Sequence, residues 1–314
     1  MRLALSAALL ALLAATPALA SPPKVVASIK PVHALVSAVM QGVGEPTLIV
    51  RGAASPHTYA LKPSDARALA EADLVFWIGP ELEGFLAKPL EATATKADAV
   101  ELLETPGLTL LDAREGGAWE PHDHGHSHKE GQGHKGGEEN GHGGVNTHVW
   151  LDPGNARVMV GAIADALAGT DAANADAYRA NAARTVQALD ALDAELKATL
   201  APVRDKPFVV FHDAYQYFQA RYGLNGVGAV TVNPERRPSA KRLSDIRARI
   251  KTLGAACVFA EPQFEPALVD TIVQGTKARK GVLDPEGAEL ADGADLYPAL
   301  LRNLAAALKD CLGS

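Results

Sequence analysis

The run Leu74-Val75-Phe76-Trp77-Ile78-Gly79 places five consecutive apolar side chains before a glycine. A strand with one face in water alternates polar and apolar residues, whereas a continuous apolar run is typical of a strand covered on both faces. We therefore predict a strand at 74–79 inside a parallel sheet that has helices on both sides. This need for covering helices indicates the α/β class of fold.

The segments around this run repeat the alternation of strand and helix. We expect further strands or extended pieces at 24–28, 46–50, 100–103, 108–111, 208–211, 226–232, 256–260 and 281–284. We expect helices at 31–40, 63–72, 82–95, 239–253, 265–278 and 298–312. Such a rhythm in each half of the chain predicts two mainly parallel sheets.

A long alanine-rich segment separates the two halves. Residues 155–168 predict one helix, and residues from about 171 to 200 predict a second, with leucines at helical spacing. At ~1.5 Å per residue the second helix reaches ~45 Å, enough to run the length of the molecule. We call it the spine helix.

These patterns predict an α/β fold of two lobes joined by the spine helix. The N-terminal lobe is expected at 21–154 and the C-terminal lobe at 201–314, with linking helices at 155–200. Residues 1–20 carry one arginine, a short apolar block and an Ala-Leu-Ala ending, which is typical of a secretory signal peptide. We expect cleavage after Ala20 and a mature protein in a bacterial periplasm.

Charge and cysteine content narrow the function. The formal net charge is −7, and loss of Arg2 with the leader makes it more negative, which argues against nucleic acid as a partner. Cys257 and Cys311 are the only cysteines, and an isolated pair in an oxidising compartment predicts a disulfide. Two thiolate zinc ligands are the alternative, but the close Cys-x-x-Cys spacing of such sites is missing.

A histidine-rich segment occupies residues 119–146. It has almost no apolar side chains, so we expect a disordered loop. It carries six of the ten histidines: His122, His124, His126, His128, His134 and His142. A tag would be terminal and unbroken, and a solvated charge run would not need alternating histidine. We interpret the loop as an auxiliary site that holds metal ions weakly.

Four histidines lie outside this loop. His33 falls in an expected helix among apolar neighbours, so we interpret it as a packed structural residue. His57, His148 and His212 lie in or beside loops, and loops at the carboxyl ends of parallel strands converge on one crevice. Asp284, at the end of the last strand, could join them. Three imidazoles and a carboxylate suit Zn²⁺, although scattered histidines alone are a weak indication.

Several longer motifs make a family resemblance specific. They are Ser55-Pro-His-Thr-Tyr-Ala-Leu-Lys-Pro-Ser-Asp, Thr147-His-Val-Trp-Leu-Asp-Pro, Phe211-His-Asp-Ala-Tyr, Phe259-Ala-Glu-Pro-Gln-Phe and Val282-Leu-Asp-Pro. Together they resemble the zinc-uptake substrate-binding proteins of ABC importers (ZnuA-type, cluster A-I), over residues 24–312. The resemblance implies two lobes, a connecting helix and a zinc site in the cleft between the lobes.

The resemblance also implies a ligand set. Its metal ligands fall on His57, His148 and His212, and imidazole at 212, where manganese-preferring relatives commonly have a carboxylate, favours zinc. Some zinc-branch members have an acidic residue directly before the first ligand, where this chain has Pro56. The fourth position is therefore Asp284 or a water, and we prefer Asp284. Glu261 is expected to have a structural role near the cleft.

The function implied is that of a monomeric periplasmic receptor. It would deliver Zn²⁺ to the membrane permease of an ABC importer, which its ATPase drives, and would not be an enzyme. A manganese or iron receptor of the same fold is one alternative. A zinc-dependent hydrolase is another, but it needs an open coordination position and a general base, and the chain has no His-Glu-x-x-His or Gly-x-Ser-x-Gly motif.

Overall fold

The computed structural model describes residues 21–93, 96–114, 119, 144–231, 234, 239–265 and 267–313. The expected signal peptide at 1–20 lies outside these residues, and so do the six histidines of the 119–146 loop. Within the part of the chain that is described, no helix is both long and apolar enough to cross a membrane.

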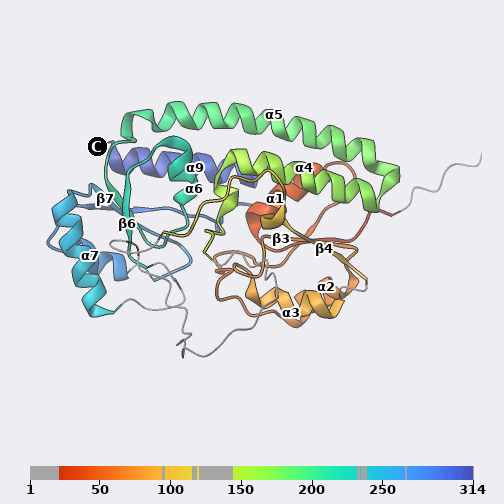
Figure 1. The fold of residues 1–314 in the computed structure, drawn as a ribbon, viewed down its shortest axis with the longest axis horizontal. Helices are drawn as coiled ribbons and strands as arrows, with labels where there is room; N and C mark the ends of the chain where they lie inside the picture. Colours follow the sequence, from red (N-terminus) through yellow and green to blue (C-terminus); the bar gives the residue numbers. More distant parts are fainter. Residues whose placement is uncertain are drawn as a thin grey trace, which may run out of the picture.

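Two four-stranded parallel sheets form the framework (Figure 1). The first has the order β2-β1-β3-β4 and the second the order β6-β5-β7-β8. Their bounds are β1 Val25–Ala27, β2 Thr47–Leu48, β3 Leu74–Trp77, β4 Asp98–Glu101, β5 Phe208–Val210, β6 Gly226–Ala229, β7 Cys257–Ala260 and β8 Arg279–Val282. Strand β3 lies between β1 and β4 with all four side chains buried, as its apolar run predicts.

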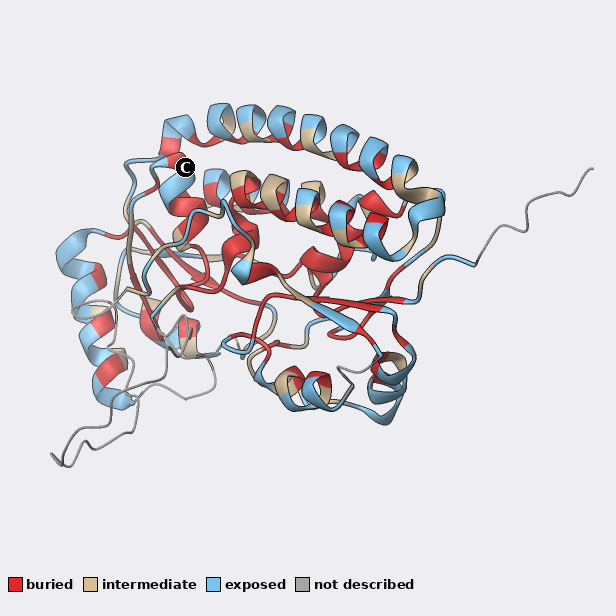
Figure 2. Ribbon diagram, turned by 45° about the vertical axis from the view of Figure 1, so that its right-hand side comes forward, coloured by how far each residue is buried: buried red, intermediate tan, exposed pale blue. Residues whose placement is uncertain are grey.

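Helices cover both faces of the first sheet. In Figure 1, α1 and α4 lie above β3 and β4, and α2 and α3 lie below them. The helices are α1 Lys30–Val39, α2 Pro63–Glu71, α3 Gly84–Thr93, α4 Pro153–Thr170, α5 Ala175–Leu200, α6 Gln216–Tyr222, α7 Ala240–Leu253, α8 Ala267–Val273 and α9 Leu296–Leu312. The inner strands β1, β3, β5 and β7 are buried, whereas the edge strands β4 and β8 and the outer helix faces are largely exposed (Figure 2). This layering confirms the expected α/β class.

The spine helix is α5. Its 26 residues extend ~39 Å, and it runs above α4 and α9 along the length of the molecule (Figure 1). Leu189, Leu192, Leu196 and Leu200 form a buried stripe at helical spacing. Helix α9 packs against α1 as well as α5, so one hydrophobic core contains residues of both sheets. This shared core fixes the facing ends of the two lobes.

Two sequence expectations differ from the structure. The extended piece expected at 108–111 joins neither sheet, because backbone groups there bond to side chains: Thr109 donates to Asn155 Oδ1 (2.8 Å) and Leu111 to the Tyr217 hydroxyl (3.1 Å). The helix expected at 265–278 is shorter, because α8 ends at Val273 and Gly275 then takes a left-handed φ of 71°.

The predicted disulfide is present. Cys257 opens β7 and Cys311 lies near the end of α9, with their Cα atoms 6.2 Å apart and a sequence separation of 54. The bond therefore attaches the second sheet to the helix that also packs against α1 and α5.

Removal of this disulfide should destabilise the fold. Closing a loop of 54 residues stabilises a protein by about 4 kcal/mol in the chain-entropy model. We expect the C257A/C311A protein to lose an amount of this order in urea unfolding at pH 7.5. Wild-type protein kept reduced should unfold at nearly the same urea concentration as the variant. An unchanged unfolding midpoint in both would contradict the prediction.

Candidate metal centre

Three histidines reach one point from separate segments. His57 lies in the loop after β2, in a turn where the Thr58 N–H donates to the Ser55 carbonyl (3.2 Å). His148 directly precedes a buried 3₁₀ turn, Val149–Leu151. His212 follows β5 by two residues and is 3% exposed. The three side chains therefore come from both halves of the chain, as the convergence of loops at strand ends predicts.

The Nε2 atoms of these rings face one another at short range. His148 Nε2 lies 3.4 Å from His57 Nε2 and 3.1 Å from His212 Nε2. Among the described residues, this is the one group of three or more His, Cys, Asp or Glu side chains whose ligand atoms all lie within 4.8 Å. Tetrahedral zinc with bonds of 2.0–2.1 Å separates its nitrogen ligands by about 3.3 Å. The spacing therefore fits a single ion of that size.

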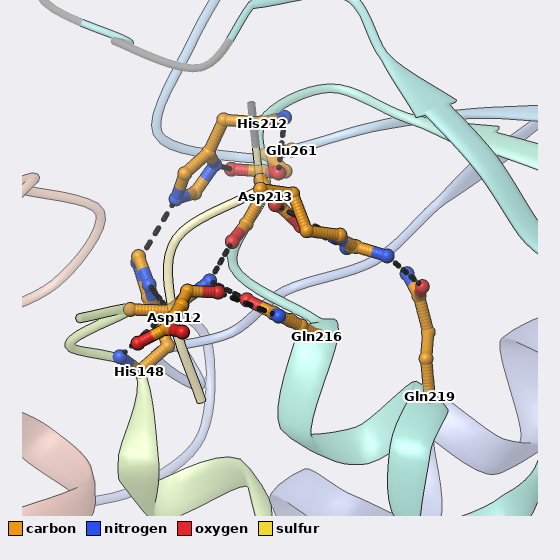
Figure 3. Close-up of polar contacts among 9 residues, drawn as sticks. Asp112, His148, His212, Asp213, Gln216, Gln219 and Glu261 are labelled. Atoms are coloured by element: carbon orange, nitrogen blue, oxygen red, sulfur yellow. Dashed lines mark hydrogen bonds and ion pairs between the residues drawn. The ribbon is translucent and has the colours of Figure 1, made fainter. Parts of the chain in front are cut away.

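Hydrogen bonds on the far side of two rings decide which nitrogen is free. His212 Nδ1 lies 2.6 Å from Glu261 Oε2 (Figure 3), and His148 Nδ1 lies 2.8 Å from Asn146 Oδ1. Both oxygens accept, so each Nδ1 carries the proton and each Nε2 presents a lone pair. Glu261 thus has the supporting role near the cleft that the sequence indicated. Asn146 was not predicted, although its place two residues before His148 was the available clue.

Burial favours the neutral form of two of the rings, His57 and His148. Desolvation, with a smaller contribution from His212, lowers the pKa of His57 to about 3. Desolvation also holds the pKa of His148 well below its usual range, helped by the two neighbouring histidines. A neutral imidazole is the form that binds a metal ion. At neutral pH these two rings therefore need not lose a proton before they could bind a metal ion.

Two of the residues considered in the sequence lie apart from this group. His33 is buried, and its Nε2 lies 3.1 Å from the Pro46 carbonyl oxygen, as expected for a packed structural residue. The structure does not bring Asp284 into the cluster. Its carboxylate instead accepts backbone N–H groups of Glu286, Gly287 and Ala288 at 2.6–3.0 Å. That carboxylate shapes the turn after β8.

A different acidic residue lies beside the histidines. The small cavity at the cluster is lined from one side by Ser55, Pro56, His57 and His148 and from the other by His212, Glu261, Gln263, Phe264, Pro285 and Glu286. Glu286 is 4% exposed. Burial, with the nearby Asp284 second, holds the pKa of Glu286 well above its usual range.

Known proteins are similar to this chain in sequence and in fold. Residues 25–311 match the family described as zinc-uptake complex component A, periplasmic. The high-affinity zinc uptake system protein ZnuA of Brucella abortus is 53% identical over 304 residues, covering 92% of this chain and 91% of that protein. ZnuA of Paracoccus denitrificans is 41% identical over 310 residues, covering 96% and 95%.

The fold likeness extends to crystal structures. A ZnuA deletion mutant with zinc bound superposes with a TM-score of 0.74 and covers 93% of this chain and 98% of its own. At 24% identity this comparison shows that the two chains share a fold.

Acid should destabilise the metal-free protein through His57. The pKa of a histidine in the unfolded chain is about 6.5, against about 3 in the folded protein, so the unfolded state takes up the proton first. The unfolding free energy should therefore fall between pH 6.5 and 3, by at most about 1.4 kcal/mol per pH unit for this ring. Above pH 6.5 the penalty is absent.

The measurement is urea unfolding at pH 7.5 and pH 5.0 with a chelator present. Wild-type protein should lose more stability between the two conditions than H57Q, whose side chain does not titrate. An equal loss in both proteins would show that this ring is not protonated preferentially on unfolding.

Proposed function

The chain belongs to the family of periplasmic zinc-uptake components, and we propose that it binds Zn²⁺ through the Nε2 atoms of His57, His148 and His212. The family is the substrate-binding part of an ABC-type zinc importer rather than an enzyme. The chain accordingly serves as a periplasmic receptor that binds zinc and delivers it to that importer. Zinc is its cargo.

One observation carries the ligand assignment: three Nε2 atoms meet at 3.1–3.4 Å around His148, and two of the rings have the opposite nitrogen occupied by an acceptor. Lone pairs that face one another repel unless a cation lies among them. Imidazole donors suit zinc and its borderline neighbours, whereas manganese prefers oxygen ligands. The donor set therefore supports zinc over the manganese alternative.

The three histidines that we propose as zinc ligands come from both lobes. His57 and His148 belong to the N-terminal half, and His212 follows a strand of the second sheet. An ion held by all three bridges the cleft, so its release requires one of these loops to move. We propose that transfer to the permease occurs through such a movement.

The six histidines of the 119–146 loop have a separate role in this proposal. They hold further ions weakly and raise the local concentration of zinc beside the cleft. We also propose cleavage of the leader after Ala20 and a monomeric receptor in the periplasm. N-terminal sequencing of exported protein and sedimentation of the purified chain check these two points.

Replacing any one of the three histidines by alanine should abolish tight zinc binding. Loss of a partner behind a ligand typically costs 10–100-fold in metal affinity, so loss of the ligand itself should cost more than about 100-fold. Calorimetric titration with a competing chelator measures the effect. H33Q is the matched control. The wild-type His33 ring is also buried, but it contacts the Pro46 carbonyl and is not one of the three clustered histidines.

Deletion of residues 120–143 separates the auxiliary ions from the cleft ion. The deletion spares Trp119 and Asn146, which contact the body of the protein. One tightly bound zinc should remain and the weak ions should disappear. Tight binding that survived the loss of His57, His148 or His212 but not this deletion would overturn the ligand assignment.

The fourth coordination position is best assigned to Glu286 or a water. Glu286 lines the same cavity as the histidines, and its turn is held from the other half of the chain: Trp150 Nε1 donates to Pro285 O (2.9 Å) and Lys30 Nζ to Ala288 O (3.2 Å). A buried carboxyl group close to the site can supply negative charge when a cation arrives.

The variants E286Q and D284N distinguish the two carboxylates. We expect E286Q to weaken zinc binding by about 10-fold or more with little change in the unfolding free energy. D284N should instead keep zinc affinity and lower the free energy of unfolding. The amide accepts fewer of the backbone N–H groups, and each group left unpaired costs about 1–3 kcal/mol. If D284N lost affinity and E286Q kept it, Asp284 would be the ligand after all.

A further inference from the structure

The backbone on either side of segment 115–143 forms a short stem, defined here as residues 111–114 and 144–146. The stem is held by an antiparallel bridge and by the Asn146 N–H, which donates to the Leu111 carbonyl (2.9 Å). It lies against α6, where the Tyr217 hydroxyl donates to the Asn146 carbonyl (2.7 Å) and accepts from the Leu111 N–H (3.1 Å). The stem is therefore attached to the second half of the chain.

Asn146 uses its whole side-chain amide at this junction. Its Oδ1 accepts from the backbone N–H of His148 (3.0 Å) and lies 2.8 Å from the Nδ1 of the same residue. Its Nδ2 donates to the Asp213 carbonyl (2.7 Å) and to Gln216 Oε1 (3.0 Å). The side chain is buried, at 7% exposure.

These partners leave one orientation for the amide. The His148 backbone N–H can only donate and the Asp213 carbonyl can only accept, so the Asn146 oxygen must face His148. His148 Nδ1 must then carry a proton to donate to that oxygen. The Nε2 lone pair is consequently directed at the metal point by a residue that does not touch the metal.

Asp213 connects this arrangement to the next ligand and to an arginine. It directly follows His212 in sequence, and its carboxylate accepts from Arg114 Nε (2.8 Å) and Nη2. Arg114 Nη1 also donates to Gln219 Oε1 (2.8 Å), and its guanidinium carbon lies 3.5 Å from the Trp119 ring centroid. Figure 3 shows Asp213 between His148 and Gln219.

We propose that Asn146 is a positioning residue of the zinc site, with Asp213 and Arg114 behind it. Asn146 fixes the tautomer and direction of His148, and its bond to the Asp213 carbonyl holds His148 at a set distance from His212. The proposal rests on the function proposed above. Zinc affinity would then depend on Asn146, Asp213 and Arg114, which do not coordinate the ion. Asn146 and Arg114 both belong to the stem.

The test compares N146A, N146D and R114Q as full-length proteins. N146A removes the acceptor and should weaken zinc binding by about 10–100-fold, with faster dissociation. N146D keeps an acceptor for His148 Nδ1 but cannot donate to the Asp213 carbonyl, so it should recover only part of that loss. R114Q leaves Asn146 in place and should show a smaller loss than N146A. Chelator competition measures affinity, and stopped-flow release to a fluorescent chelator measures the dissociation rate.

Two measurements separate positioning from a general loss of structure. Long-range ¹H–¹⁵N spectra of the metal-free protein report the tautomer of His148, which should be mixed in N146A and Nδ1-protonated in wild type and N146D. R302Q is the control for an ion pair, because Arg302 makes the same two-pronged contact with Glu195 on the spine helix. R302Q should leave zinc affinity unchanged.

The outcomes are distinct. Wild-type zinc affinity and a wild-type His148 tautomer in N146A would overturn the positioning role. Equal losses of zinc affinity in N146A and N146D would also overturn it. Equal losses of affinity in R114Q and R302Q would do the same. Tight binding that persists in H148A would instead overturn the proposed function. If N146A did not fold, R114Q against R302Q and the tautomer in N146D would decide the question.

Discussion

Three imidazoles whose Nε2 atoms meet at one point form the constraint on which this structure depends. The two buried rings, His148 and His212, present Nε2 lone pairs to each other at 3.1 Å, an arrangement that is unfavourable by itself because lone pairs repel. It is maintained here because two rings cannot turn away: Glu261 and Asn146 hold the opposite nitrogens of His212 and His148. A cation bound among the three nitrogens would offset this repulsion.

That geometry requires a framework that keeps distant segments in register. His148 lies 91 residues from His57 and 64 residues from His212 along the chain, so local structure cannot bring the three rings together. The shared hydrophobic core does so, with α5 and α9 spanning both sheets. The Tyr297 hydroxyl, which donates to the Trp150 carbonyl (2.6 Å), extends this connection from α9 to the segment that carries His148.

The sequence predicts the features that depend on regular patterns. Apolar runs identify the strands, leucine spacing identifies α5, and the two cysteines identify the disulfide. Motif resemblance points to His57, His148 and His212. It does not show that Asp284 is occupied by the backbone of its own turn, because this depends on the path of residues 285–288. The role of Asn146 is equally hidden, since its second partner, the Asp213 carbonyl, comes from the other half of the chain.

The stem has a consequence for how this protein can diverge. Asn146 bonds to Leu111 and Ala113 bonds to Gly144, so the chain leaves the body and returns to it at neighbouring points. An insertion between such points changes no register in either sheet. Its closure entropy rises only with the logarithm of its length, by about 0.6 kcal/mol for each doubling. Segments of very different length and composition can therefore be exchanged at this position in evolution without disturbing either sheet.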